Sequence, residues 1–218
     1  MKNHEKENEA LKLPRLKVNG EIILHMRSTQ NLFNGSWKYS KMGLVQFARM
    51  MTMLSKAASQ EDPYAEWYLL KTYQALFDAK KELKAIELKL AGYFDPVRGV
   101  SITLIANEQA LHCPLHFSTP FGFIGANLLA EVDYVLRQLV TLKRIGSPLP
   151  ENITEPTLVA YVQRAFSLAR HWHSMGITRR DIHDNSEKYQ KANALMGDIP
   201  DAVLKKEIEF SLMPKRKK

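Results

Sequence analysis

Residues 62–90 read DPYAEWYLLKTYQALFDAKKELKAIELKL, and this stretch indicates the fold class more clearly than any other part of the chain. Asp62 is a favoured helix N-cap, and Pro63 suits the first helical position. Gly92 lies just beyond the stretch and is typical of a helix end. The stretch therefore predicts one long helix from Asp62 to Leu90, and its apolar stripe repeats every seven residues through Leu69, Leu76, Leu83 and Leu90.

Leucines with this spacing also occur in leucine zippers, which join two chains. In a zipper the second core position of each heptad is apolar as well. Here that position is mostly polar, because it holds Glu66, Tyr73, Lys80 and Glu87. We therefore expect the leucine stripe to pack inside its own domain.

Working outward from this helix, the pattern predicts further helices on both sides. Apolar residues recur at helical spacing, and caps and Gly or Pro residues mark the ends. Ser40 is the expected cap of the helix that carries Leu44, Phe47, Met51 and Leu54. The expected helical segments are a short turn over 28–33 and helices over 40–57, about 120–145, 156–173 and 202–210.

Strands are expected in three short segments where apolar and polar residues alternate. In residues 21–27, Ile22, Leu24 and Met26 would face the core, while the alternate residues from Glu21 to Arg27 would face outward. Segments 101–105 and 111–117 are expected to form a hairpin, with the strand of Pro114 at an edge or at an interface that tolerates a missing hydrogen-bond donor. The predicted fold class is α+β, mostly helical, with a ribbon-helix-helix type of unit inside a larger helical domain.

The length of 218 residues and a hydrophobic content of 45% allow one sizeable core. We expect a flexible arm over residues 1–19, a single domain over 20–210 and a basic tail over 211–218. A lone cysteine, Cys113, indicates a reducing compartment. Because no signal peptide and no membrane span is evident, a cytoplasmic protein with no membrane partner is expected.

The chain has 31 basic and 23 acidic side chains, a net charge of +8, and the excess is unevenly distributed. Residues 21–60 contain five basic residues and only Glu21 as an acid, whereas 101–200 are balanced. A localised basic field is expected of proteins that meet a polyanion, since phosphate contacts release counterions.

The sequence lacks the common motifs of enzyme active sites. It has no glycine-rich phosphate loop, no nucleophile elbow and no His-Glu-x-x-His motif. His112 and His116 would lie about 13 Å apart on a strand, too far to share a metal ion. We therefore expect no enzyme activity, no catalytic residue, no metal site and no cofactor.

Two segments could form a DNA-binding ribbon followed by two helices. In the first, strand 21–27 precedes the helix of 40–57; its candidate DNA contacts are His25, Arg27, Lys38, Lys41 and Arg49. In the second, strand 111–117 precedes helices near 120–145 and 156–173; its candidates are His112, His116, Lys143 and Arg144, with Glu151 and Glu155 as opposing charges.

Charge favours the first segment and helix length favours the second, so the choice stays open. Neither segment contains a second strand of its own. We therefore expect the ribbon to need a homodimer in which each copy contributes one strand.

Four short motifs carry a resemblance to a known family. They are LHMR at 24–27, LFNG at 32–35, DPYAEWYLL at 62–70 and PFGFIGANLL at 120–129. In this order they resemble the AcaB-type transcriptional regulators, a group that includes many proteins of integrating conjugative elements. The resemblance covers about residues 20–205. It implies a ribbon-helix-helix DNA-binding factor that activates conjugative-transfer genes.

Together these observations predict a homodimeric, sequence-specific regulator that binds double-stranded promoter DNA through a β-ribbon and has RNA polymerase as a further possible partner. The alternative is a non-enzymatic structural or interaction protein of a conjugative element, working through its long helix. The basic excess of residues 21–60 favours the regulator, because an adaptor does not need it.

Overall fold

The computed structural model describes residues 20–35, 41–94, 101–207 and 210–214. The expected arm over 1–19, Lys38, Ser40 and residues 215–218 of the expected tail lie outside this part. In chain order the elements are β1 (Gly20–Leu24), α1 (Arg27–Asn34), α2 (Leu44–Ser59), α3 (Pro63–Ala91), the 3-10 turn η1 (Gly92–Phe94), β2 (Leu111–Leu115), α4 (Pro120–Arg144), α5 (Glu155–Arg170), α6 (Arg179–His183), α7 (Glu187–Met196) and α8 (Asp201–Leu204).

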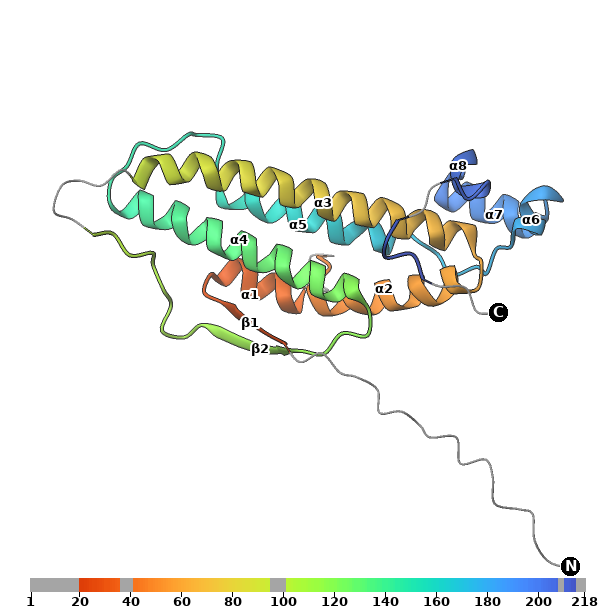
Figure 1. Ribbon diagram of the computed structural model, residues 1–218, viewed down its shortest axis with the longest axis horizontal. Helices are drawn as coiled ribbons and strands as arrows, with labels where there is room; N and C mark the ends of the chain where they lie inside the picture. Colours follow the sequence, from red (N-terminus) through yellow and green to blue (C-terminus); the bar gives the residue numbers. More distant parts are fainter. Residues whose placement is uncertain (1–19, 36–40, 95–100, 208–209, 215–218) are drawn as a thin grey trace, which may run out of the picture.

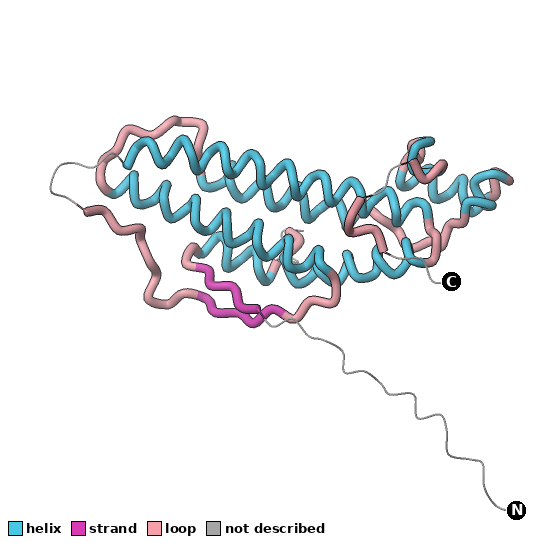
Figure 2. Tube along the Cα trace, in the orientation of Figure 1, coloured by secondary structure: helices cyan, strands magenta, loops and turns pink. Residues whose placement is uncertain are grey.

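Four helices, α2 to α5, form the body of the molecule, and every pair among them is in contact. In Figure 1, α2 and α5 run in one direction along the bundle, and α3 and α4 run in the other. The ribbon of β1 and β2 lies along one side, against α1 and α4 (Figure 2). The mixed, mostly helical class predicted from the sequence is confirmed.

Helix α3 is the element that the sequence predicts best. The Asp62 carboxylate caps it by accepting hydrogen bonds from the backbone N–H groups of Tyr64 and Ala65, at 3.0 and 3.2 Å. Its heptad leucines are all buried within this one chain, which confirms the expectation of packing inside the domain and accounts for Leu69, Leu76, Leu83 and Leu90.

The helix expected from Ser40 begins later than predicted, at Leu44 after Gly43. Two glycines allow the end of α1 and the start of α2 to approach each other closely. Gly35 has a φ of 76°, and a Cβ placed on Gly43 would lie only 2.2 Å from the Gly35 nitrogen. The backbones at Gly35 and Gly43 are therefore so close together that a residue with a side chain would not fit at these positions.

The prediction that 101–105 and 111–117 form a hairpin is wrong. Residues 101–105 form no strand; instead Ile105 bonds to α4, donating from its N–H to the Thr141 hydroxyl at 3.0 Å and accepting from Arg137 Nε at 2.7 Å. Strand β2 pairs in antiparallel fashion with β1, with Gly20 opposite Leu115 and Leu24 opposite Leu111.

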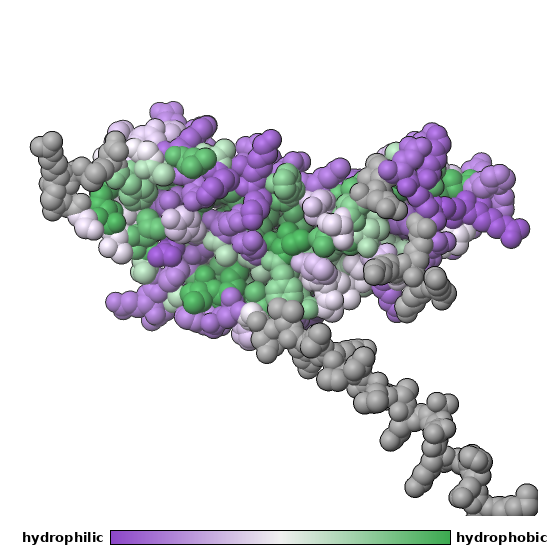
Figure 3. Space-filling view, viewed as in Figure 1, coloured by the Kyte–Doolittle hydropathy of each residue, from purple (hydrophilic) through white to green (hydrophobic). Residues whose placement is uncertain are grey.

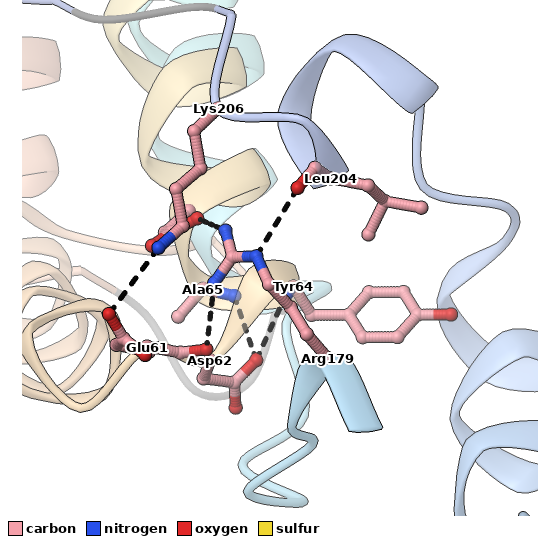
Figure 4. Close-up of polar contacts among 8 residues, drawn as sticks. Glu61, Asp62, Tyr64, Ala65, Arg179, Leu204 and Lys206 are labelled. Atoms are coloured by element: carbon pink, nitrogen blue, oxygen red, sulfur yellow. Dashed lines mark hydrogen bonds and ion pairs between the residues drawn. The ribbon is translucent and has the colours of Figure 1, made fainter. Parts of the chain in front are cut away.

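Helices α6 to α8 cluster at the end of the bundle where α3 begins (Figure 1). The predicted helix over 202–210 is shorter in the structure, and α6 and α7 were not predicted. Arg179 of α6 ties this cluster to the bundle. Its guanidinium forms an ion pair with the buried Glu66 of α3 and donates to the carbonyl oxygens of Leu204 and Glu61, each at 3.3 Å (Figure 4).

Candidate nucleic-acid interface

The ribbon has one face toward the bundle and one toward solvent. On the inner face, Ile22, Leu24 and Leu115 are buried. The outer face carries four exposed side chains, in two cross-strand pairs that follow from the register. These pairs are Glu21 opposite Pro114 and Ile23 opposite His112.

A polar side-chain contact crosses the outer face diagonally. Nδ1 of His112 lies 3.4 Å from the Glu21 carboxylate, and both side chains are more than half exposed. Such an exposed pair contributes at most about 1 kcal/mol to folding. Both groups are therefore available to an outside partner at little cost.

The two candidate segments that the sequence left as alternatives are joined by the structure. The strand of the first segment, β1, pairs with the strand of the second segment, β2, so one chain supplies both strands of the ribbon. The expectation that the ribbon needs a second copy is therefore wrong. It failed because strands about 90 residues apart in sequence show no local sign of their pairing.

His25 lies just beyond β1, since the strand ends at Leu24 and not at Arg27 as predicted. Its ring is already engaged: Nδ1 accepts from the backbone N–H of Asn107 at 3.2 Å. The side-chain amide of Asn107 donates to the His25 carbonyl at 3.2 Å. Through its ring Nδ1 and its carbonyl oxygen, His25 thus joins the ribbon to loop 106–110.

Asp133 of α4 is a functional candidate that sequence reasoning missed. Its buried carboxylate accepts from the backbone N–H groups of His25 and Met26, at 3.0 and 2.8 Å, and from the Thr29 hydroxyl at 2.5 Å. One side chain therefore fixes the end of β1 and the start of α1 against α4. The only signal in the sequence is an acid next to Val132 in the apolar part of a helix.

The basic candidates are exposed but lie in different places. Arg27 begins α1, His116 follows β2, and both flank the ribbon. Lys143 and Arg144 are in the last turn of α4, about 15 Å along the helix from Asp133 at the usual rise of 1.5 Å per residue. They lie at the end of the bundle, away from the residues that anchor the ribbon.

Helix α2 carries the other described candidates, Lys41 at its approach and Arg49 within it, and both are exposed. The structure packs α5 against α2, with Phe47 and Phe166 stacked at a centroid distance of 4.3 Å. Residues 41–60 and 156–180 contain no acid at all. The basic residues Lys56, Arg164 and Arg170 are exposed on these two helices, which adds them to the candidates.

Apolar residues are also exposed on the ribbon side of the molecule, where Figure 3 shows them over α3, α4 and the ribbon. Ile23, on the outer face of the ribbon, is 44% exposed. Cys113 points inward beside it, and burial raises the pKa of its thiol. The cysteine therefore packs as a small apolar residue.

In the part of the chain that the structure describes, no three His, Cys, Asp or Glu side chains gather as ligands for a metal ion. No helix in those same ranges is both long and apolar enough to cross a membrane.

Comparisons with known proteins agree with this architecture. A family model described as "Transcriptional regulator AcaB" matches residues 12–216. A solved structure that is similar in fold is the crystal structure of selenomethionine-containing AcaB from uropathogenic E. coli. The two chains are 12% identical with a TM-score of 0.56, and the match covers 88% of this chain and 97% of that one. No curated protein matches the chain.

Proposed function

The chain belongs to the AcaB family of transcriptional regulators, and from this premise we propose that it binds double-stranded promoter DNA sequence-specifically through the β1–β2 ribbon. One observation carries the proposal, namely that β1 and β2 pair into a two-stranded ribbon whose outward side chains are exposed. Five residues per strand give a length of about 17 Å. A ribbon of this size fits a major groove that is about 12 Å wide.

The outer face offers chemistry that base edges can recognise. A carboxylate such as Glu21 accepts from the amino group of cytosine, and an alkyl side chain such as Ile23 contacts the methyl group of thymine. An imidazole N–H of His112 donates to the N7 acceptor of a purine. The ribbon thus combines three kinds of base contact on one surface.

Phosphate contacts would hold the ribbon in the groove. Arg27 and His116 flank the ribbon and are exposed, which suits them to the two phosphate backbones. His25 lies at the same end as Arg27. The remaining basic candidates would extend the contact along the duplex; they are Lys38, Lys41, Arg49, Lys143 and Arg144.

We further propose that the protein works in the cytoplasm as an activator of conjugative-transfer genes, with RNA polymerase as a partner. The resemblance of its four motifs to regulators of conjugative elements supports this proposal. The homodimer stays a prediction, but it no longer follows from the ribbon, because one chain already provides both strands.

The test is a binding measurement on a promoter fragment of a conjugative-transfer gene. We expect the full chain to bind this duplex more tightly than a shuffled duplex of the same composition at the same salt concentration. Fluorescence anisotropy gives both affinities. Equal affinity for the two duplexes, or no binding to either, would sink the proposal.

A structural or interaction protein is the second candidate, and α3 carries the observation that favours it. Phe77 and Leu88 are 62% and 65% exposed on the surface of this helix. Such residues suit an apolar protein partner. This candidate predicts that the promoter and shuffled duplexes bind equally weakly.

A further inference from the structure

A ribbon that two identical subunits share presents every outward side chain twice, related by a twofold axis, and it reads a palindromic site. The ribbon of this protein has both strands in one chain. We infer that a single copy of the chain reads a DNA site that has no twofold symmetry. This inference rests on the proposed function.

The outward side chains of the two strands share no residue type. Strand β1 contributes Glu21 and Ile23, whereas β2 contributes His112 and Pro114. Rotating the ribbon by half a turn about its centre exchanges Glu21 with His112 and Ile23 with Pro114. A carboxylate would then occupy the place of an imidazole, so the two halves of the ribbon are chemically different.

Each end of the ribbon therefore selects different bases. The end with Glu21 and Pro114 has one acceptor and a ring without a hydrogen-bonding group, which favours the amino group of cytosine. The end with Ile23 and His112 combines an alkyl group with an imidazole N–H, which favours a thymine methyl group beside a purine N7. A palindrome would offer both ends the same bases and would suit only one of them.

The supports behind the two strands differ as well. β1 runs into the eight-residue helix α1, while β2 leads to the 25-residue helix α4. Asp133 of α4 clamps the β1 end through His25 and Met26. The ribbon is thus held in place by its own chain, with Ile22 and Leu24 buried beneath it, and needs no second copy for support.

The experiment selects binding sites from a library of random-sequence duplexes with the purified full chain. We expect an enriched motif that differs from its own reverse complement. Native mass spectrometry of the chain on the enriched duplex should show one chain per motif.

Two substitutions assign the halves of the motif. Glu21→Gln should weaken the preference for cytosine at one position by roughly tenfold, and His112→Gln should do the same for a purine at a different position. The controls are Glu82→Gln on α3 and His183→Gln on α6, which change the same residue types at exposed sites outside the ribbon. Both controls should leave the motif unchanged.

A palindromic motif bound by two chains, in which Glu21→Gln alters two symmetry-related positions, would overturn the inference and leave the proposed function standing. Failure of the wild-type chain to enrich any motif would instead overturn the proposed function itself, and the inference with it.

Discussion

The Asp133 carboxylate connects α4 with the junction of β1 and α1, about a hundred residues earlier in the chain. It accepts hydrogen bonds from two backbone N–H groups and one hydroxyl, and it is only 3% exposed. An acid in a helix gives no local sign of partners about a hundred residues away. This residue could therefore be found only from the structure, whereas the Asp62 cap was readable because its partners are the next residues of the chain.

Removing the Asp133 carboxylate should destabilise the protein strongly. Asp133→Ala leaves the N–H groups of His25 and Met26 without their acceptor, and we expect a decrease of about 3 kcal/mol in the free energy of unfolding. Urea denaturation measures it. The matched control is Asp78→Ala on the exposed side of α3, expected to change stability by less than about 0.5 kcal/mol. Equal effects of the two substitutions would contradict this role.

Two neighbouring arginines offer a second comparison at the residue scale. The Arg179 side chain is 25% exposed and pairs with Glu66, which is 6% exposed. Arg179→Ala leaves that buried carboxylate without its guanidinium, and we expect a decrease of about 2 kcal/mol in stability, below the range of fully buried pairs. Arg180 is 90% exposed, so Arg180→Ala should cost less than about 0.5 kcal/mol. Similar melting temperatures for the two variants would show that the Arg179 tie is unimportant.

The Asp181 carboxylate in the cap of α6 should make the stability of the protein depend on pH in the acid range. The Thr178 hydroxyl and N–H both donate to the Asp181 carboxylate, and these bonds hold its pKa below the ordinary 3.8. Because the folded pKa is the lower one, the stabilisation is complete above the ordinary pKa and disappears as pH falls through the folded value.

We therefore expect Asp181→Asn to lower the melting temperature at neutral pH, with the difference from wild type shrinking below about pH 4. Thermal melts of both proteins across the acid range check this. A difference that grows in acid would contradict the assigned direction of the pKa shift.

At the scale of whole elements, the sequence predicts what local signals determine. Helices α3 and α4 have local end signals and apolar stripes, and α3 also has the Asp62 cap directly before it. The alternation in Leu111 to Leu115 likewise predicts a strand, but its partner depends on the folded chain. The same alternation in residues 101–105 gives no strand, because Arg137 and Thr141 of α4 take up the backbone groups of Ile105.

The exposed basic residues of α2 and α5 yield a prediction that the charge count along the sequence does not suggest. Residues 151–200 balance to zero, yet the structure sets the acid-free part of α5 beside α2. Among the described residues, no ion-pair partner is found for Arg49, Lys56 or Arg164. These three side chains are therefore available to contact DNA phosphates.

We expect Lys56→Gln and Arg164→Gln to weaken binding to promoter and shuffled DNA equally. The slope of log K against log salt should flatten by about 0.9 for each phosphate that the substituted side chain no longer neutralises. Lys84→Gln on α3, where the lysine pairs with Glu87 at 2.9 Å, is the control that removes the same charge. A slope that stays at the wild-type value would remove α2 and α5 from the DNA-binding surface.

For the molecule as a whole, the bundle supports the small ribbon that we propose as the reading surface. Four long helices bury the core, and the ribbon is attached to it through apolar contacts and through Asp133. The sequence predicted the mostly helical class and the two strands, and it located the basic excess near the first strand. It could not show that the strands share one ribbon, and our inference about the symmetry of the DNA site rests on this pairing.

The central claim is that the outer face of the ribbon distinguishes DNA sequences. The most direct test is the ratio of affinities for a selected duplex and a shuffled duplex, compared between the wild type and a Glu21→Ala, His112→Ala double variant. We predict that the ratio falls to about one in the variant, while affinity for the shuffled duplex changes little, because base contacts carry the specificity and phosphate contacts the general affinity. A double variant that folds and keeps the wild-type ratio would contradict the claim.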